Sequence, residues 1–288
     1  MPELPEVETI RRRLAPRVEG RVLRRFDVLD ARWTRPRPPA EIEAALTGRR
    51  VDRLARRGKY LVWELEDEHY LLAHLRMTGA LLYDPPLEPA HARARIELSD
   101  GHRVVYDDPR RFGTGELAVG AAALQGFFAA RLGVEPLDGA FTPAGLRAAG
   151  RGSRAPIKAF LLNQRRVAGV GNIYADEALF RAGVHPLRQA RALKPGQWRA
   201  LHAAVIDALQ AGIAADGASI DDYRDPDGVR GSFQDEFLVH RRAGEPCVRC
   251  GTSVRKIVAA GRGTYVCERC QPRPRVASGA RPTSRAAR

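Results

Sequence analysis

The cysteines restrict the fold of this chain more than any other feature of its sequence. All four lie in one short segment near the C-terminus, as two Cys-x-x-Cys motifs with sixteen residues between them. They are Cys247, Cys250, Cys267 and Cys270. Two motifs at this separation are typical of tetrahedral thiolate coordination of zinc. Their confinement to one segment excludes a disulfide-stapled secreted protein, and we expect one structural Zn²⁺.

The segment between the two motifs has the pattern of a β-hairpin. Residues Val254–Val258 and Thr264–Cys267 alternate like strands, and Gly261-Arg262-Gly263 separates them as a turn. This pattern places Arg262 at the tip of a zinc-held hairpin. A guanidinium in that position suits a phosphate, although a turn arginine exposed to solvent is the simpler alternative.

The net charge predicts a polyanionic partner. The chain has 288 residues, a formal net charge of +14 and an isoelectric point near 10.4. A folded protein with this excess usually binds nucleic acid. Only four of the 48 basic residues are lysines, namely Lys59, Lys158, Lys194 and Lys256. Because a lysine amine can lose its proton when buried and a guanidinium effectively cannot, these lysines are candidates for chemistry.

The length allows two or three domains, each with its own core. No stretch is long and apolar enough to span a membrane. The acidic N-terminus, with Glu3, Glu6 and Glu8, is unlike a signal peptide. We therefore expect a cytoplasmic protein with no membrane partner.

The first residues, MPELPEVETIRRRL, place a proline directly after the initiator methionine. Removal of Met1 would make the nitrogen of Pro2 a secondary amine, which can attack a carbonyl carbon and form a Schiff base. An α-amino group titrates at about pH 8, so much of it is neutral at physiological pH. Glu3 beside it is a ready proton shuttle. For Met-Pro on its own, the simpler alternative is an ordered N-terminus without chemistry.

Periodicity predicts strands in the first half of the chain. A helix is expected over residues 1–13, followed by strand-like runs between residues 20 and 120. The expected strands are Arg21–Leu29, Tyr60–Leu65, Tyr70–Leu75, Ala94–Leu98 and Arg103–Tyr106. Several short strands at this spacing indicate a β-sandwich or barrel.

Helices and loops are predicted in the second half. Residues 133–152 have the prolines and glycines of a linker. The expected helices are Ser153–Gln164, with Ser153 as N-cap, then Asn172–Ala182 and Pro195–Ala215. Residues 216–233 are rich in Gly, Asp and Arg and predict a mobile loop, and the basic tail 272–288 is expected to be disordered.

Two further groups of loop residues suit DNA. The run Val167-Ala-Gly-Val-Gly-Asn172 lies between two expected helices, where glycines let the backbone approach a ligand and a helix start offers N–H groups to a phosphate. A plain N-cap is the alternative role for Asn172. Met77, Arg110 and Phe112 lie at expected strand ends. Core-edge packing would explain them, but a wedge pushed into a base stack is the sharper hypothesis.

Together these motifs resemble the bacterial formamidopyrimidine-DNA glycosylases, which are bifunctional glycosylases and abasic-site lyases. The resemblance runs from Met1 to about Gln271. The matching runs are MPELPEVETIRR, RRGKYL, HLRMTG, DPRRFG, NQRRVAGVGNIYADEALFRAGVHP, GEPC and CERCQ. The resemblance implies an α+β multidomain fold, with an N-terminal β-sandwich and flanking helices, a helix–two-turn–helix domain and a C-terminal β-hairpin zinc finger.

The resemblance also implies a domain plan and partners. The domains would be a catalytic β-sandwich at 1–132, a linker at 133–152, the helix–two-turn–helix domain at 153–237 with a lesion-capping loop at 216–233, and the zinc finger at 238–271. Damaged double-stranded DNA would lie between the lobes of a monomer, in the cytoplasm and on the nucleoid. The zinc would be structural, and no redox or nucleotide cofactor is implied.

The implied activity is removal of oxidised purines, such as 8-oxoguanine and formamidopyrimidines, followed by β,δ-elimination. Pro2 would form the Schiff base and Glu3 would shuttle protons. Lys59 and Arg262 would contact the phosphate next to the lesion and assist the two eliminations. The implied DNA-binding residues are His74, Met77, His91, Arg110, Phe112, Ser153, Arg154, Lys158 and Asn172, with Arg110 facing the orphan cytosine. Glu6 and Glu177 would line the pocket.

The chain departs from the family pattern in three places. His240-Arg241-Arg242 stands where the family usually has a Tyr-Gly-Arg-like run. His91-Ala92-Arg93-Ala94 lacks the second His or other polar residue that is common there. The expected capping loop is acidic, with Asp221, Asp222, Tyr223 and Asp225. Base preference is therefore less well defined than the lyase chemistry.

Three alternatives stay open at this point. An endonuclease VIII-type glycosylase for oxidised pyrimidines usually begins Pro-Glu-Gly, whereas Leu4 follows Glu3 here, and the set of Met77, Arg110 and Phe112 is complete. A non-catalytic lesion-binding zinc protein would fit the charge, but it would not need Pro2, Glu3 and Lys59. A zinc-dependent transcription factor fits less well, because no recognition helix is apparent.

Overall fold

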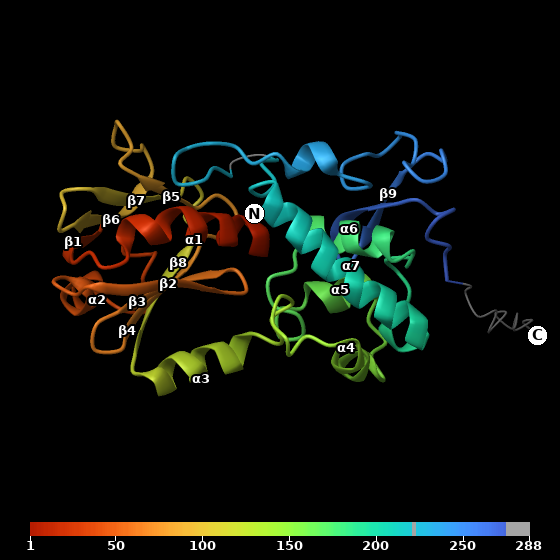
Figure 1. Cartoon of the computed structure of the whole chain (residues 1–288), viewed down its shortest axis with the longest axis horizontal. Helices are drawn as coiled ribbons and strands as arrows, with labels where there is room; N and C mark the ends of the chain where they lie inside the picture. Colours follow the sequence, from red (N-terminus) through yellow and green to blue (C-terminus); the bar gives the residue numbers. More distant parts are fainter. Residues whose placement is uncertain (221–222, 275–288) are drawn as a thin grey trace, which may run out of the picture.

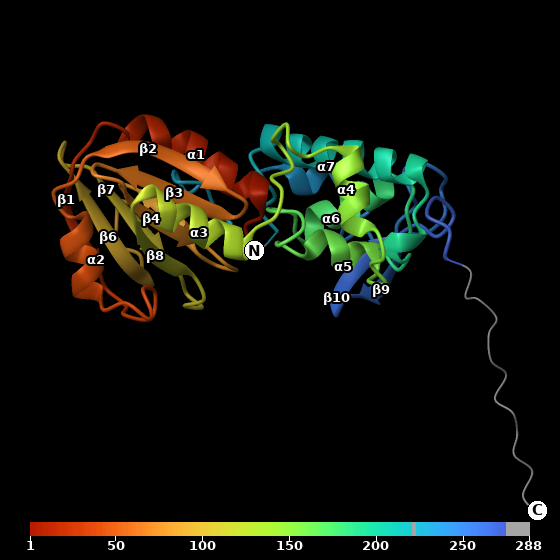
Figure 2. The same ribbon diagram turned by 90° about the horizontal axis from the view of Figure 1, so that it is seen from below.

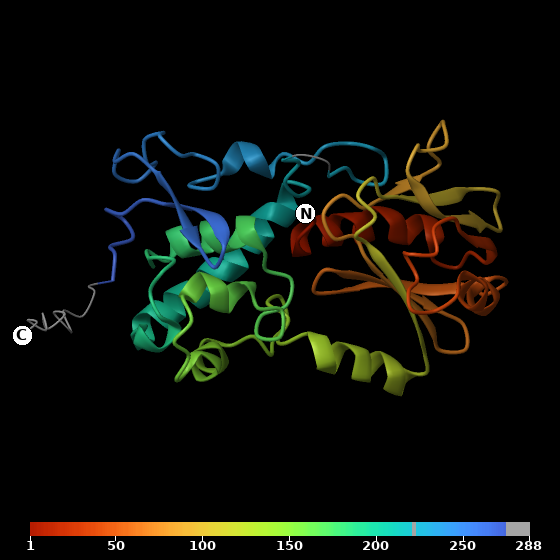
Figure 3. The same cartoon turned by 180° about the vertical axis from the view of Figure 1, so that it is seen from behind.

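The computed structural model describes residues 1–220 and 223–274, which form two lobes joined by a short connection (Figure 1). Asp221, Asp222 and most of the tail expected to be disordered, residues 275–288, lie outside the described residues. The N-terminal lobe holds the sheets, and the C-terminal lobe holds helices and a small hairpin. The start of the chain lies at the junction of the lobes, also in the view from behind (Figure 3).

The N-terminal lobe is the predicted β-sandwich. One sheet has the order β1 (Leu23–Val28), β6 (Ala92–Leu98), β7 (Arg103–Asp107) and β5 (Ala80–Tyr83). The other has the order β2 (Val51–Arg57), β3 (Tyr60–Leu65), β4 (His69–His74) and β8 (Thr114–Val119). Both are antiparallel. Their inner faces share a core with α1 (Leu4–Val18) and α2 (Pro39–Leu46).

Helix α1 begins and ends as its sequence dictates. Glu3 and Glu6 form a reciprocal capping box, and a proline stands in the first turn, where its missing N–H has no cost. The helix continues five residues beyond the expected end at residue 13, because Leu14 and Val18 extend its buried face. That apolar face packs between the sheets and holds the N-terminus at the lobe junction.

The C-terminal lobe packs four α-helices and the hairpin. The helices are α4 (Pro143–Gly150), α5 (Ile157–Leu162), α6 (Asn172–Arg181) and α7 (Pro195–Ala214), with short 3₁₀ turns at Ala190–Ala192 and Phe233–Glu236. The hairpin consists of β9 (Arg255–Ala259) and β10 (Arg262–Val266). In the described part of the chain, no helix has the length and apolar character needed to cross a membrane.

Two expectations about this lobe are wrong. The region 133–152 is not simply a linker, because it contains α4, and Leu146 is buried in the helical core while Gly150 lies against the ring of Trp198. The helix expected from Ser153 begins four residues later, at Ile157. Pro156 is its N-cap, and a proline disfavours helical backbone in the residue before it, so Ser153 cannot cap this helix.

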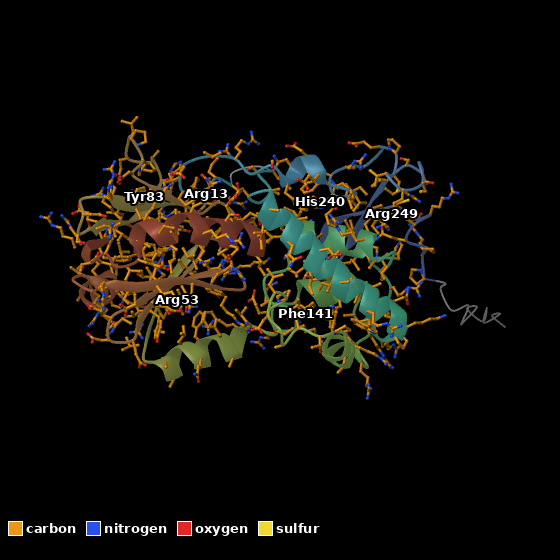
Figure 4. All side chains as sticks on the ribbon, in the orientation of Figure 1. Arg13, Arg53, Tyr83, Phe141, His240 and Arg249 are labelled. Carbon is orange, nitrogen blue, oxygen red and sulfur yellow. The ribbon has the colours of Figure 1, made fainter. Side chains whose placement is uncertain are left out.

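Several acidic residues of the expected mobile loop contact α1. Arg13 on α1 forms ion pairs with Asp216 at 2.8 Å and Asp225 at 3.1 Å. Arg17, one turn further, pairs with Asp227 at 2.5 Å. The position of Arg13 on α1, below this segment, is visible in Figure 4. The acidic character of the loop is therefore matched to the basic face of α1.

Candidate active site and zinc hairpin

A cavity of about 530 Å³ lies where the lobes and the hairpin meet. The N-terminus contributes Met1 and Glu3, the sandwich contributes Met77 and Arg110, and α6 contributes Asn172. Arg262 and Gly263 of β10 close another side. The cavity therefore brings together five motifs that are far apart in the sequence.

Glu3 is held at the cavity by the other lobe. Its carboxylate accepts hydrogen bonds from the backbone N–H of Ile173 at 3.0 Å and of Tyr174 at 3.5 Å, at the start of α6. It therefore uses the helix N–H groups that the sequence suggested for a phosphate. Pro2 is buried directly before it. This arrangement fixes the Pro2–Glu3 segment against the helix start.

The glycines of the Val167–Asn172 run explain how the lobes approach so closely. A Cβ atom at Gly171 would lie 2.2 Å from the carboxyl carbon of Glu3. Gly169 has a positive φ of 83°, and a Cβ there would lie 2.6 Å from a methyl group of Leu4. The N–H of Leu4 donates to the carbonyl of Gly169 at 3.0 Å. The glycines are thus needed for contact with the N-terminus of the chain.

Glu6 lies one turn behind Glu3 and is fully buried. Burial and the neighbouring Glu3 carboxylate raise its pKa. Tyr174 donates its hydroxyl to Glu6 at 2.7 Å, and the N–H of Ala218 donates at 2.8 Å. Glu6 is buried behind the cavity-lining Glu3, and its place in the pocket stays a prediction. It joins α1 to α6 and to the start of the loop.

Lys59 lies directly before β3, in the tight turn that follows β2. It is buried, and this burial lowers the pKa of its ammonium, while the nearby Glu3 and Glu6 carboxylates oppose the shift and Arg262 adds to it. These couplings place Lys59 in the same electrostatic environment as the acidic residues and the hairpin arginine. A buried lysine with a lowered pKa is suited to accept and return protons.

The hairpin presents Arg262 at the cavity. The turn is Ala260-Gly261, both with positive φ, so Arg262 is the first residue of β10 and not the middle of the turn as expected. Behind it, the carbonyl of Gly263 accepts from Lys158 at 3.3 Å and from Asn172 at 3.2 Å. Asn172 is the first residue of α6, and Gly171 is the N-cap, so the plain N-cap role is excluded.

Lys158 is an internal residue in the structure. Its ammonium forms an ion pair with Asp176 at 2.7 Å, and both side chains have no exposed surface. Asp176 also accepts from the Nδ1 of His240 at 2.9 Å and from the N–H of Tyr265 at 3.3 Å. His240 lies in the C-terminal lobe, beside the hairpin (Figure 4). The prediction of Lys158 as a DNA contact is therefore replaced by a role behind the hairpin.

The strand-end loops are organised by a buried residue that the sequence reasoning missed. Asp108 accepts from the hydroxyl of Thr78 at 2.5 Å and from the N–H of Gly113 at 2.8 Å. The hydroxyl of Tyr106 lies where a Cβ of Gly79 or Gly113 would clash. The Asp in the DPRRFG run was the available signal, since a carboxylate after a buried strand commonly organises the next turn.

The predicted wedge residues Met77 and Phe112 project from these loops into solvent. Met77 is 42% exposed and Phe112 is 52% exposed, and the guanidinium of Arg110 lies 4.8 Å from the centre of the Phe112 ring. His74 lies close by, at the end of β4. Burial lowers its pKa to about 3, and its Nδ1 accepts the N–H of Arg76 at 3.0 Å, so the neutral ring carries its hydrogen on Nε2.

The remaining predicted residues lie outside the cavity. His91 and Arg154 are exposed and Ser153 is half-buried. Glu177 is fully buried, and its carboxylate accepts the N–H groups of residues 238–240 at 2.9 to 3.1 Å. Its predicted place in the pocket is therefore wrong, because it holds the chain segment that enters the zinc module.

Of the cavity residues that were not predicted, three carry basic or imidazole side chains. Lys256 of β9 lines the cavity beside Arg262, and the scarcity of lysines was a signal that could have found it. His240 and Arg241 also line it. Arg241 has a positive φ of 58°, which explains why a glycine suits this position in the resembling family.

The four cysteines fit a zinc ion. Their sulfur atoms all lie within 4.8 Å of one another, with 3.8 Å between Cys247 and Cys270 and 3.5 Å between Cys250 and Cys267. A tetrahedral site with Zn–S bonds of about 2.3 Å requires sulfur separations of about 3.8 Å. Cys247 and Cys267 are also packed against Phe180 of α6. These residues form a structural zinc site that fixes the hairpin on the helical lobe.

Comparisons with known proteins agree with this geometry. Residues 1–115 match the formamidopyrimidine-DNA glycosylase N-terminal domain, residues 132–224 match the H2TH domain of the same enzymes, and residues 244–273 match the zinc finger found in FPG and IleRS. The formamidopyrimidine-DNA glycosylase of Chloroflexus aurantiacus is 43% identical over 277 residues, which cover 94% of this chain and 98% of that protein.

Solved structures show the same similarity. A complex of the Lactococcus lactis FPG mutant G226P with Fapy-dG-containing DNA has a TM-score of 0.88 and 37% identity, covering 94% of this chain and all of that one. Wild-type Lactococcus lactis FPG with DNA containing an oxidised pyrimidine has a TM-score of 0.87 and 36% identity, with the same coverage. The sandwich, the helical lobe, the four-cysteine hairpin and these similarities together establish that the chain belongs to the formamidopyrimidine-DNA glycosylase family.

Proposed function

We propose that this protein excises oxidised purines from duplex DNA and then cleaves the strand at the abasic site. The observation that carries the proposal is the cavity that Glu3 and the hairpin Arg262 both line, together with the buried Lys59, which is electrostatically coupled to both residues. Met1 lines that cavity, so its removal would leave the Pro2 amine facing the space in which a nucleotide would bind.

The chemistry follows from these groups. The Pro2 amine attacks C1′, the glycosidic bond breaks, and the base departs with a proton that Glu3 is placed to supply. The C1′–O4′ bond of the sugar then breaks as O4′ takes a proton, and the resulting iminium acidifies the C2′ proton. Lys59, with its lowered pKa, is suited to assist that proton transfer, and the 3′ phosphate ester breaks. A second elimination breaks the 5′ ester, where Arg262 would stabilise the departing phosphate.

The rest of the predicted site supports binding of a bent duplex. Met77 and Phe112 project from loops fixed by Asp108 and suit insertion into a base stack, with Arg110 beside them for the orphan base. His74 and Asn172 are placed for the backbone, with His91, Ser153 and Arg154 as outlying contacts. The proposed partner is damaged double-stranded DNA, bound by a cytoplasmic monomer, with the lobe boundaries as expected from the family apart from α4.

Oxidised purines and oxidised pyrimidines are the two candidate substrate classes. The Lactococcus relative is described with DNA containing Fapy-dG and with DNA containing an oxidised pyrimidine. We favour purines because Leu4 follows Glu3 and because the wedge set is complete. An endonuclease VIII-type preference is the second candidate.

The test is borohydride trapping on a duplex with 8-oxoguanine opposite cytosine, with undamaged duplex and a Pro2→Gly variant as controls. A covalent adduct mapped to Pro2, and absent from both controls, is the expected result. Trapping on an oxidised-pyrimidine duplex alone would assign the other substrate class. Tight binding without any adduct would mean that the protein binds lesions without catalysis.

A further inference from the structure

Helix α3 (Ala121–Arg131) contributes no residue to the candidate site. It is connected to the site through Tyr60, which contacts both α3 and His74. It follows β8 and lies over the outer face of the second sheet, on the path between the lobes (Figure 2). None of its residues is buried. It begins at a glycine without a side-chain cap and contains Gly126 in its middle, so its intrinsic stability is low.

Aromatic contacts hold this helix on the sheet. Phe127 and Phe128 lie with their ring centres 5.4 and 5.9 Å from that of Tyr60, in edge-to-face arrangements. The two phenylalanine rings are also edge-to-face, at 5.3 Å. The guanidinium of Arg131 covers the Phe127 ring at 3.9 Å. Such contacts contribute beyond the apolar area that they bury, because the ring edges carry partial positive charge.

Tyr60 links this cluster to the candidate site. It follows Lys59 directly, and in the register of β3 and β4 it pairs with His74. The rings of Tyr60 and His74 meet at 89°, with centres 4.7 Å apart. The His74 ring is otherwise fixed by one hydrogen bond, from the N–H of Arg76. This edge-to-face contact restricts rotation of the His74 ring and therefore the direction in which its Nε2–H can donate.

We propose that Phe127 and Phe128 are positioning residues that set the orientation of His74 for a DNA phosphate, acting through the ring of Tyr60. The inference rests on the proposed function, in which His74 contacts the DNA backbone. Sequence gave no indication of it, because neither phenylalanine lies in a motif that resembles the family. Only the packing of α3 on the sheet brings them to Tyr60.

The experiment is a mutant cycle on DNA affinity. The equilibrium Kd for a duplex with an uncleavable abasic-site analogue is measured for wild type, His74→Ala, Phe127→Leu/Phe128→Leu, and the combination. Leucines keep apolar volume on α3 but remove the ring edges. Leu124→Ala is the matched control, because Leu124 packs against the same cluster without a ring contact to Tyr60.

We expect His74→Ala to weaken binding about tenfold, as for loss of one hydrogen bond to a charged group. The leucine pair should weaken it about threefold, as for loss of an aromatic pair. Because both act through one imidazole, the combination should bind no worse than His74→Ala alone. In the leucine variant, the NMR signals of the His74 ring protons should shift as the Tyr60 ring moves.

Four results would overturn the proposal. Multiplicative effects in the combination would mean that the phenylalanines act independently of His74. An unchanged Kd for His74→Ala would mean that His74 does not contribute to DNA binding. An unchanged Kd for the leucine pair would mean that the phenylalanine rings do not affect it. An equal loss of DNA affinity in Leu124→Ala would show that the effect comes from packing of α3 in general and not from the phenylalanine rings. Borohydride trapping at Pro2 does not depend on these variants, so failure of the proposed function would be recognised separately.

Discussion

Gly171→Ala is the most direct test of how the two lobes assemble the catalytic centre. The new methyl carbon would lie 2.2 Å from the Glu3 carboxyl carbon and 2.4 and 2.5 Å from its oxygens. Favourable carbon contacts need about 3.5 Å or more, so the carboxylate must move by more than about 1 Å. The backbone at Gly171 has a φ of −127°, which alanine adopts without strain, so the effect is steric.

The structure gives the expected magnitude. Displacing Glu3 removes the acceptor for the N–H groups of Ile173 and Tyr174, which is comparable to the loss of a capping side chain at a helix start. Such a loss costs about 1 to 2 kcal/mol. For a chain of this size the midpoint of thermal unfolding should fall by about 2 to 3 °C. Excision of the base should slow about a hundredfold or more, because a misplaced proton shuttle no longer reaches the reacting atoms.

The assay is single-turnover release of 8-oxoguanine, with cleavage of a preformed abasic site measured separately. The second reaction needs no proton for a departing base and should be less affected. Gly139→Ala is the control, since no atom lies within 4 Å of its added Cβ. Glu3→Gln is the companion variant, which keeps an oxygen for the cap and should lose excision with little change in thermal stability.

Wild-type excision by Gly171→Ala, together with an inactive Glu3→Gln, would refute the reasoning. It would mean that the backbone of the glycine run yields and that the helix start does not fix the carboxylate. A loss of thermal stability without a loss of excision would mean that the hydrogen bonds of Glu3 to the start of α6 are not needed for its role in excision.

Three further predictions concern the zinc site, the wedge and Lys59. Cys250→Ala should lose zinc, measured by metal analysis, and bind damaged duplex more weakly; intact zinc content and affinity would contradict the assigned site. Arg110→Ala should reduce the preference for lesions opposite cytosine by about tenfold while Pro2 trapping persists, checked with each opposite base. Because burial lowers the pKa of Lys59, the unfolded chain binds more protons than the folded one between that lowered pKa and 10.5, and stability rises with pH across this window. Lys59→Met should therefore be more stable than wild type at neutral pH in urea unfolding, and the difference should shrink as the pH approaches 10.5.

Short-range patterns in the sequence were enough to locate several elements of the structure. The paired Cys-x-x-Cys motifs led to the zinc hairpin, and a short apolar run bounded by turn residues located β3 at Tyr60–Leu65. By contrast, β2 was missed, because Val51–Arg57 contains four charged residues and resembles a loop. Helix α4 was missed because its prolines and glycines resemble a linker, although they serve as helix start and helix packing sites.

The roles of charged residues were also only partly predictable from local sequence patterns. Lys158 and Glu177 look like site residues in the sequence, and the structure buries both as internal supports. Asp108 was overlooked, and it organises the loops that carry the wedge residues. Burial and partner choice depend on contacts between segments that lie far apart in the chain, and no local pattern encodes them.

The sequence by itself determined the chemistry available to this protein: a proline that becomes an amine, a carboxylate beside it, a few lysines and four thiolates. Tertiary structure alone decided which groups share a cavity. Glu3 reaches the start of α6 only because Gly171, 168 residues further along, has no side chain to block it. The physical reason is that covalent identity is a local property, whereas desolvation, hydrogen-bond partners and orientation arise only when the two lobes exclude water from the same space.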